Sequence, residues 1–288
     1  SEDVETAARE TMEAVTSALS TGSNTLSARE ATGRFMDRLA ELQSNGEMPG
    51  ASTGLDEIDA VTGGVKQGEL WTVAAETSRG KSVLLLQTAG AAAKQGLNVL
   101  VFSLEMTADE VVSRVLVGTY GIPIEAVNRP GSATKRELEM IGTKSAKFIQ
   151  TGMLINDDPA LTADRIYAEV ERANDRKGLD VVIVDYVQLM SGERKRGETE
   201  AEEISRNVKR LKQIAKKFKV SVLTASQLND EGKLFASRAI GHHSDVVLRI
   251  FEDGVKVQKN RNGPRGQKLN LEMAGERQRS VSFSETPD

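Results

Sequence analysis

The stretch "AAETSRGKS", residues 74–82, decides the fold of this chain. It ends in Gly-Lys-Ser, as does the phosphate-binding pattern G-x-x-x-x-G-K-[ST], which lies between a strand and a helix. The apolar "WTVAA" that runs into the stretch predicts the strand, and residues 81–94 predict the helix. Ala75 stands where the pattern has its first glycine. Alanine fits there only with a negative φ, so we expect a slightly different loop shape.

A loop in this context binds phosphate because its backbone N–H groups converge at the N-terminus of a helix. We expect Lys81 to reach the β- and γ-phosphates of a nucleotide and the Ser82 hydroxyl to bind Mg²⁺. The alternative is a helix that happens to begin with a lysine. The expected nucleotide contacts in the loop are Thr77, Ser78, Arg79, Gly80, Lys81, Ser82 and Val83.

Polar side chains end three further apolar segments. Asp185 follows "VVIV", Glu105 follows "VFSL" and Gln227 follows "LTAS". A hydrated Mg²⁺ is a natural partner for a buried carboxylate such as Asp185, although a cap on the next element is the alternative. At the carboxyl edge of a parallel sheet, where ligands bind, Glu105 is placed to deprotonate an attacking water. Gln227 either senses the γ-phosphate at that edge or caps a turn.

The order of the remaining segments predicts an α/β fold. Apolar segments at 98–105, 153–158, 180–189 and 220–227 alternate with helical patterns at 109–120, 162–176 and 198–218. Short strands at 245–252, 255–260 and 268–273 follow. The alternation favours a mostly parallel sheet flanked by helices, and the ending favours antiparallel strands at its C-terminal edge.

Composition narrows the classes of function. The 288 residues carry a net charge of −4 and no cysteine, which excludes disulfides and thiolate metal sites and is compatible with a reducing cytoplasm. No apolar run approaches the roughly 18 residues of a membrane span, so we expect no membrane partner. A nucleic-acid partner must meet a local basic patch, because the overall charge does not attract it.

Two short amphipathic segments precede the main body. We expect a helical segment within residues 1–24, then a linker helix and tether over 25–50, then one domain over 51–288. Ser27 and Glu30 form a capping-box pattern, and Phe35, Leu39 and Leu42 form an apolar stripe. Such stripes need a surface to cover, either on this chain or on a neighbour.

The motifs together resemble a known family. "TGLDEIDAVTGGVKQGELWTVAAETSRGKS", "VFSLEM", "VIVDYVQLMSG", "TASQLN" and "KNRNGPRG" occur in this order. Over roughly residues 25–275 they resemble the C-terminal ATPase domain of DnaB-type replicative helicases, which has a RecA-like fold. That family also carries alanine at the first glycine position of the loop, whereas Arg79 is less usual there.

The resemblance implies a role for each matched residue. Lys81, Ser82 and Asp185 would bind ATP and Mg²⁺, Glu105 would be the catalytic base, and Gln227 would couple the γ-phosphate to the DNA loops. Arg114 matches an arginine near the nucleotide. Lys259 and Arg261 match a basic pair that is donated to the nucleotide of the adjacent subunit, where a cation stabilises the charge that develops on the γ-phosphate. A solvated hairpin charge is the alternative for Arg261.

The resemblance also implies partners. A hexameric ring would translocate on single-stranded DNA in the 5′ to 3′ direction in the cytoplasm of a bacterial or phage-infected cell, with primase and a helicase loader as further partners. The DNA candidates are Lys233, Arg238, Arg194, Lys195 and Arg196, with solvated loop charge as the alternative for the last three. Adjacent His242 and His243 make a poor metal site. The short N-terminal part indicates either a small member of phage or plasmid type or a trimmed chain.

Two other classes of protein compete with a helicase. A RecA-like DNA-dependent ATPase that acts as a loader, a recombination mediator or a circadian-clock-type ATPase shares the fold and the loop but does not unwind DNA. A scaffold with a dead site is the third class, and the intact Lys81, Glu105, Asp185 and Arg261 argue against it.

Overall fold

The computed structural model describes residues 25–45, 48–190, 198–228, 237–274 and 277–283. The chain divides between Glu47 and Met48 into a small N-terminal unit and a large unit, which are treated separately. The first helical segment expected, within residues 1–24, lies outside the described residues. Among the described helices, none is both long enough and apolar enough to span a bilayer.

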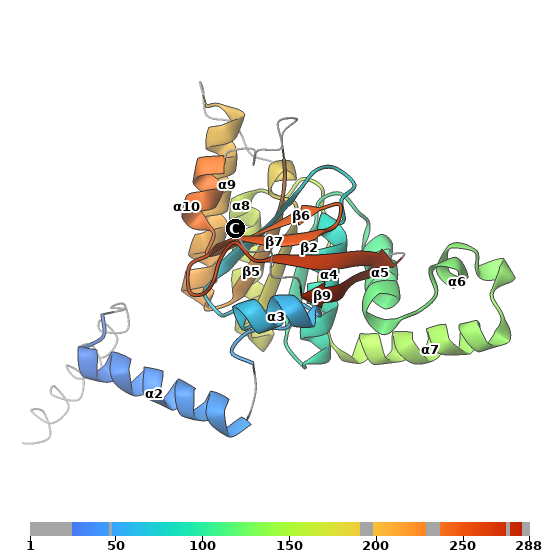
Figure 1. Ribbon diagram of the computed structural model, residues 1–288, viewed down its shortest axis with the longest axis horizontal. Coiled ribbons are helices and arrows are strands. Elements are labelled where there is room, and N and C mark those ends of the chain that lie inside the picture. The colour runs from blue at the N-terminus through green and yellow to red at the C-terminus, as the bar shows by residue number, and fades with distance from the viewer. Residues whose placement is uncertain (1–24, 46–47, 191–197, 229–236, 275–276, 284–288) are drawn as a thin grey trace, which may run out of the picture. The chain divides into compact units, whose positions relative to one another are not determined.

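A single sheet of nine strands forms the centre of the large unit, in the order β3-β2-β4-β5-β1-β6-β7-β8-β9 (Figure 1). The pairings from β3 to β6 are parallel, and those from β6 to β9 are antiparallel. This confirms the expected mostly parallel sheet with antiparallel strands at one edge. The strands are β1 Leu70–Ala75, β2 Val99–Ser103, β3 Leu154–Asn156, β4 Val181–Asp185, β5 Ser221–Gln227, β6 Val246–Phe251, β7 Gly254–Asn260, β8 Lys268–Ala274 and β9 Arg277–Phe283.

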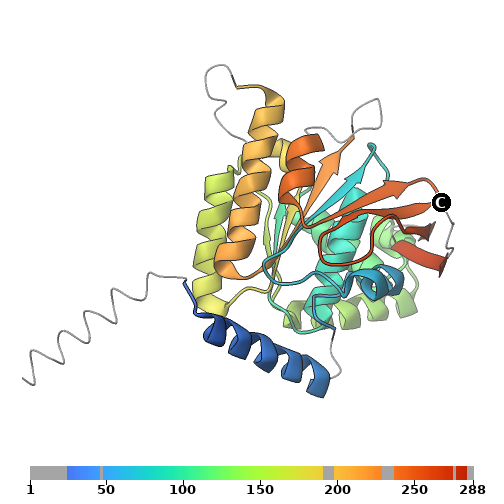
Figure 2. The same ribbon diagram turned by 60° about the vertical axis from the view of Figure 1, so that its left-hand side comes forward.

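Helices cover both faces of the parallel part of the sheet. In the large unit they are α3 Asp56–Thr62, α4 Lys81–Lys94, α5 Ala108–Tyr120, α6 Ile124–Asn128, α7 Lys135–Gln150, α8 Ala163–Lys177, α9 Glu200–Phe218 and α10 Ser237–His243, with short 3₁₀ turns at Pro130–Ser132 and Val187–Leu189. Figure 2 shows α8 and α9 side by side on one face. Alternate residues of β4 enter the two cores: Val182 and Val184 pack with α8 and α9, whereas Val181 and Ile183 pack with α4 and α5. Burial on both faces explains why this strand is continuously apolar.

Several boundaries differ from those expected. The strand expected over 180–189 ends at Asp185, where a cis peptide bond joins it to Tyr186 and a 3₁₀ turn follows. The helix expected from Glu198 begins at Glu200, because Thr199 and Glu202 form a capping box there. The sequence patterns missed α3, α6, α7, α10 and β9. Helix α7 carries Leu138, Ile141 and Phe148 at helical spacing but buries only Phe148, and it lies with α6 beyond α5 (Figure 1).

In the N-terminal unit, the expected linker helix is α2, Ala28–Asn45. Its capping box is present: the Glu30 Oε2 atom accepts hydrogen bonds from Ser27 N at 2.8 Å and Ser27 Oγ at 2.7 Å. Phe35, Met36 and Leu39 are exposed on this helix.

Candidate functional site

The loop between β1 and α4 has the backbone conformation that its sequence predicts. Ala75 is the last residue of β1 and is absent from the described non-glycine residues with positive φ, so the negative φ expected of it is confirmed. Gly80 precedes α4 with φ 84° and ψ 19°, a left-handed conformation that glycine adopts without strain. Ser78, at φ 59°, also has a left-handed backbone. Successive left-handed and right-handed residues turn backbone N–H groups toward one point, as an anion site requires.

The Lys81 side chain folds back over this loop. Its Nζ atom donates hydrogen bonds to the carbonyl oxygens of Ala75 at 3.1 Å and Glu76 at 2.8 Å. Burial lowers the pKa of Lys81, while the carboxylates of Asp185 and Glu105 act in the opposite direction. The ammonium therefore contacts the loop backbone and lies near enough to both carboxylates to interact with them.

A cavity of about 410 Å³ opens above the loop, within the range of small-molecule sites. It brings together residues from the ends of β1, β2, β4 and β5 and from α5. The lining residues are Thr77, Ser78, Arg79, Gly80, Lys81, Ser82, Val83, Glu105, Met106, Arg114, Tyr186 and Gln227. All the loop residues expected from the sequence are included, together with Glu105, Arg114 and Gln227. Met106 and Tyr186 were not expected, although each directly follows a residue that was.

Asp185 lies buried beside this cavity at the end of β4, with 1% of its surface exposed. Neither carboxylate oxygen accepts a hydrogen bond of good geometry among the described residues. Burial raises the pKa of Asp185 to about 6; the nearby Ser82 hydroxyl lowers it, Glu105 raises it, and Lys81 and Arg114 lower it. A buried carboxylate in this state is a costly arrangement in the absence of a cation.

The donor set fits Mg²⁺. Asp185 and Ser82 offer hard oxygen ligands, and the described residues contain no cluster of three or more His, Cys, Asp or Glu that could hold a metal ion alone. Mg²⁺ is bound in this way in nucleotide sites, by one or two protein oxygens together with substrate phosphates.

Side chains at the ends of β5 and β6 contact the loop directly. Gln227 Nε2 donates to Thr77 Oγ1 at 2.7 Å, which connects the end of β5 to the loop. Arg79 forms ion pairs with Glu76 at 3.5 Å and, beyond the end of β6, with Glu252 at 3.7 Å. These pairs are solvent-exposed, so each contributes little to stability.

Residues 50–281 match the family model described as the DnaB-like helicase C-terminal domain. The chain belongs to this family. The replicative DNA helicase DnaB of Leifsonia xyli is 34% identical over 78% of this chain and 54% of its own length. The corresponding protein of Geobacillus stearothermophilus is 29% identical over 77% of this chain and 54% of its own length. The chain thus spans about half the length of these curated relatives.

Solved structures share the fold of this DnaB-like domain. One of them, described as an ATPase domain, matches with a TM-score of 0.77 at 21% identity, over 86% of this chain and 95% of that one. A DnaB-like replicative helicase, reported with its interactions with primase, matches with a TM-score of 0.76 at 20% identity, over 90% of this chain and 68% of that one. The RadB recombinase matches less closely, with a TM-score of 0.55 at 19% identity, over 81% of this chain and 100% of that one.

The basic pair expected to act on a nucleotide lies outside the cavity of this DnaB-like domain. Lys259 is near the end of β7 and Arg261 follows it, and β7 runs antiparallel to β6, so both lie where β1 and β6 begin. The loop lies where β1 ends. The six residues of β1 span roughly 17 Å at about 3.3 Å per residue, which separates the pair from the loop of its own subunit.

Most of the DNA candidates lie outside the described residues. These are Arg194, Lys195, Arg196 and Lys233; Arg238 belongs to α10, but its side chain is not described. The carbonyl oxygen of His242 accepts a hydrogen bond from Arg261 Nη2 at 3.2 Å, and the two histidines belong to no metal-binding cluster in the described part of the chain.

Proposed function

We propose that this DnaB-like domain is the ATP-driven motor of a ring-shaped replicative helicase that translocates on single-stranded DNA. The observation that supports this most is the cavity, where a phosphate-binding loop, an acidic residue and an arginine converge beside the buried carboxylate of Asp185. The match to replicative DNA helicases supports the choice of helicase over other RecA-like ATPases.

The residues of the cavity supply the parts that phosphoryl transfer needs. Backbone N–H groups of residues 77–82 hold the phosphates, and Lys81 leaves the carbonyl oxygens of Ala75 and Glu76 to bind the β- and γ-phosphates. Ser82 and Asp185 would hold Mg²⁺, which would neutralise charge on the phosphates. Glu105 is an exposed residue of the cavity lining, and it accepts the proton of the attacking water. Arg114 supplies a further positive charge within the same subunit.

Completion of the site requires a second subunit. Lys259 and Arg261 lie near the start of β1, whereas the loop lies at its end. They therefore cannot reach the nucleotide of their own subunit. They act on the nucleotide of a neighbour that is joined head to tail. A heterologous contact of this kind closes into a ring when its rotation permits, and we propose a hexamer. The exposed apolar residues of α2 add a second contact between subunits.

Partners and direction follow from the same proposal. Single-stranded DNA passes through the ring in contact with Lys233, Arg238 and the basic residues 194–196, with translocation in the 5′ to 3′ direction. Primase and a helicase loader are the proposed protein partners; the structural neighbour reported with primase supports the first of these. Contacts to phosphate make binding strongly dependent on salt and weakly dependent on sequence.

ATP hydrolysis with and without single-stranded DNA, beside a strand-displacement assay, tests the proposal. We expect DNA to stimulate hydrolysis and the protein to displace an annealed strand, both of which Lys81→Ala abolishes. DNA-stimulated hydrolysis without displacement would indicate a loader or a recombination mediator. No hydrolysis by the unmodified protein would indicate a scaffold.

Mixed oligomers test the shared site. Arg261→Ala protein, in which every subunit of the ring lacks Arg261, is expected to bind ATP but to hydrolyse it poorly. Mixing it with Lys81→Ala subunits restores activity, because some interfaces then pair an intact Lys81 with an intact Arg261. Full turnover by a protein that stays monomeric at micromolar concentration contradicts the shared site.

A further inference from the structure

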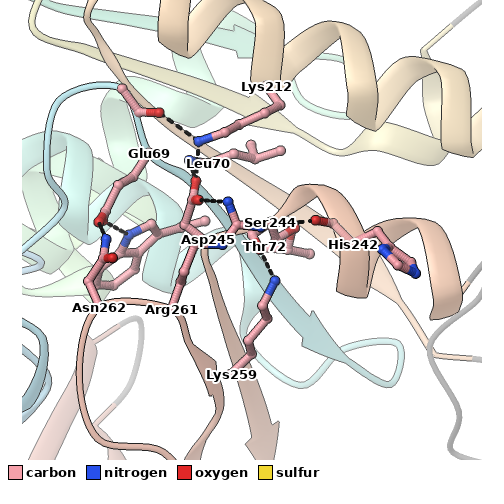
Figure 3. A network of polar contacts seen from close by, with 12 residues as sticks. Glu69, Leu70, Thr72, Lys212, His242, Ser244, Asp245, Lys259, Arg261 and Asn262 are labelled. Carbon is pink, nitrogen blue, oxygen red and sulfur yellow. Dashed lines mark hydrogen bonds and ion pairs between the residues drawn. The ribbon is translucent and has the colours of Figure 1, made fainter.

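Asp245, immediately before β6, is a buried carboxylate shared by three parts of the fold (Figure 3). Its side chain is 5% exposed. The Oδ2 atom accepts hydrogen bonds from the backbone N–H of Leu70 at 2.8 Å and from Lys212 of α9. The Oδ1 atom pairs with Arg261 Nη1 at 3.0 Å. One carboxylate therefore joins the start of β1, helix α9 and the turn after β7.

Carbonyl groups at the C-terminal end of α10 and in Ser244, which follows it, hold the same turn from a second side. His242 O accepts from Arg261 Nη2 at 3.2 Å. Gly241 O and Ser244 O accept from Lys259 Nζ at 2.7 and 2.5 Å. The backbone N–H of Arg261 also donates to Asp245 O at 2.9 Å, so both the main chain and the side chain of Arg261 are fixed.

The neighbouring residue anchors the turn at a third point. Asn262 Nδ2 donates to Glu69 Oε1 at 2.8 Å, and Glu69 Oε2 accepts from the indole N–H of buried Trp71 at 2.9 Å. The turn cannot pivot about Arg261 without breaking this contact as well.

The Arg261 side chain remains about half exposed to solvent in spite of these contacts. A guanidinium has about five N–H donors, and within the described residues each terminal nitrogen makes one of the two contacts given above. With 48% of the side chain exposed, the remaining donors face outward. An arginine held on one side and open on the other is oriented for phosphate and loses little rotamer freedom on contact.

We propose that Asp245 is a positioning residue that orients Arg261 toward the nucleotide of the adjacent subunit. The proposal rests on the shared site proposed above. It adds that the charge on Asp245, rather than the hairpin alone, determines where the Arg261 guanidinium points. It also ties Arg261 to α10, which follows the segment that carries Lys233.

Asp245→Asn tests the proposal because it removes the charge and retains the shape. The amide oxygen still accepts from Leu70 N–H, whereas the ion pairs with Arg261 and Lys212 are both lost. We expect kcat of the DNA-stimulated ATPase to fall about 10- to 100-fold, as misplacement of a catalytic group by about 1 Å does. KM for ATP stays within about twofold, since the nucleotide pocket of the same subunit is untouched.

Two readouts separate positioning from a general structural effect. In an Arg261→Ala background, Asp245→Asn is expected to cause no further loss of kcat, because the group that it orients is gone. Mixed with Lys81→Ala subunits, Asp245→Asn subunits are expected to regain activity, because the Lys81→Ala neighbours donate a correctly held Arg261. Damage confined to the fold of one subunit gives neither result.

Lys212→Met is the matched control. Lys212 contacts the same carboxylate from α9 and also donates to Gly68 O at 2.8 Å, but it does not contact Arg261. We expect it to lower the unfolding temperature about as much as Asp245→Asn while kcat stays within about twofold. Equal loss of kcat in the two variants would overturn the proposal.

The outcomes separate the two proposals. Full activity of Asp245→Asn, or a loss that multiplies with that of Arg261→Ala, overturns the role of Asp245 and leaves the shared site standing. Full activity of Arg261→Ala overturns the shared site, and the role of Asp245 with it.

Discussion

Replacement of Asp185 by asparagine is expected to stabilise the nucleotide-free domain at neutral pH while it abolishes hydrolysis. Burial raises the pKa of Asp185 from 3.8 to about 6, so the charged form is the disfavoured one in the folded state. The difference is roughly 2 pKa units at about 1.36 kcal/mol each, or about 3 kcal/mol that asparagine avoids. For a domain of this size, that corresponds to a rise in Tm of about 5–10 °C.

The pH dependence has a definite sign. Below pH 3.8 Asp185 is protonated in both the folded and the unfolded state. Between 3.8 and about 6 the folded state binds more protons, so rising pH costs the unmodified protein stability, and the loss is complete above about 6. The stability of Asp185→Asn lacks this component. The difference in the free energy of unfolding between the two proteins should therefore widen from pH 4 to pH 6 and then stay constant. Both proteins keep the same neighbours around the site, Ser82, Glu105, Lys81 and Arg114.

Chemical unfolding of both proteins from pH 4 to pH 8, with a chelator and without nucleotide, measures this gap. Asp59→Asn is the matched control. Burial also raises the pKa of Asp59, but its oxygens accept hydrogen bonds from Ser52 Oγ at 2.6 Å and Thr53 Oγ1 at 2.8 Å, so its loss is expected to destabilise the fold. The reasoning is refuted if Asp185→Asn is less stable than the unmodified protein at pH 7.5, or if the gap does not change with pH.

Three further variants probe other parts of the chain. Glu105→Gln is expected to leave nucleotide binding nearly intact and to lower kcat about 10²–10⁴-fold, the usual contribution of a general base; normal turnover would remove Glu105 from that role. Arg79→Ala is expected to raise KM for ATP several-fold, while the free energy of unfolding changes by less than about 1 kcal/mol because its ion pairs are exposed; an unchanged KM would argue against a nucleotide contact. Gly90→Ala would place a Cβ atom 2.1 Å from Thr119 Oγ1, so thermal unfolding should report a loss of about 1–3 kcal/mol, relieved in part by Thr119→Ala; an unaffected Tm would show that α4 and α5 separate freely.

Local patterns predicted the phosphate-binding loop, helix α4 and the strand ends beside the cavity well. Helix α4 has the bounds expected for it, Lys81–Lys94, because glycine, lysine and serine mark its start and an apolar face continues it. Glu105, Asp185 and Gln227 could be predicted as neighbours because parallel strands end at one edge of a sheet. Tyr186 and Met106 carry no such signal, since only the course of the chain after each strand turns them toward the cavity.

Contacts between distant residues could not be predicted. The bond between Leu70 and Asp245 joins residues 175 positions apart, and no periodicity marks either residue as a partner of the other. The same holds for Asn262 and Glu69, 193 positions apart. Strand β9 was missed because its segment, "RQRSVSF", is polar and lies at the edge of the sheet, where one neighbour is enough to define a strand.

The reversal of chain direction at the β6–β7 turn affects which form of the protein can consume ATP in the cell. A parallel strand in place of β7 would place Arg261 at the end of β1, beside the phosphate-binding loop of its own subunit. A single subunit could then hydrolyse ATP without a neighbour. The antiparallel strand places Arg261 at the opposite end of β1 from the loop, so under the shared-site proposal a solitary subunit binds nucleotide but cannot hydrolyse it. Under the shared-site proposal, ATP consumption then follows the number of closed assemblies rather than the amount of protein. On that proposal, dilution alone stops ATP hydrolysis, without an inhibitor.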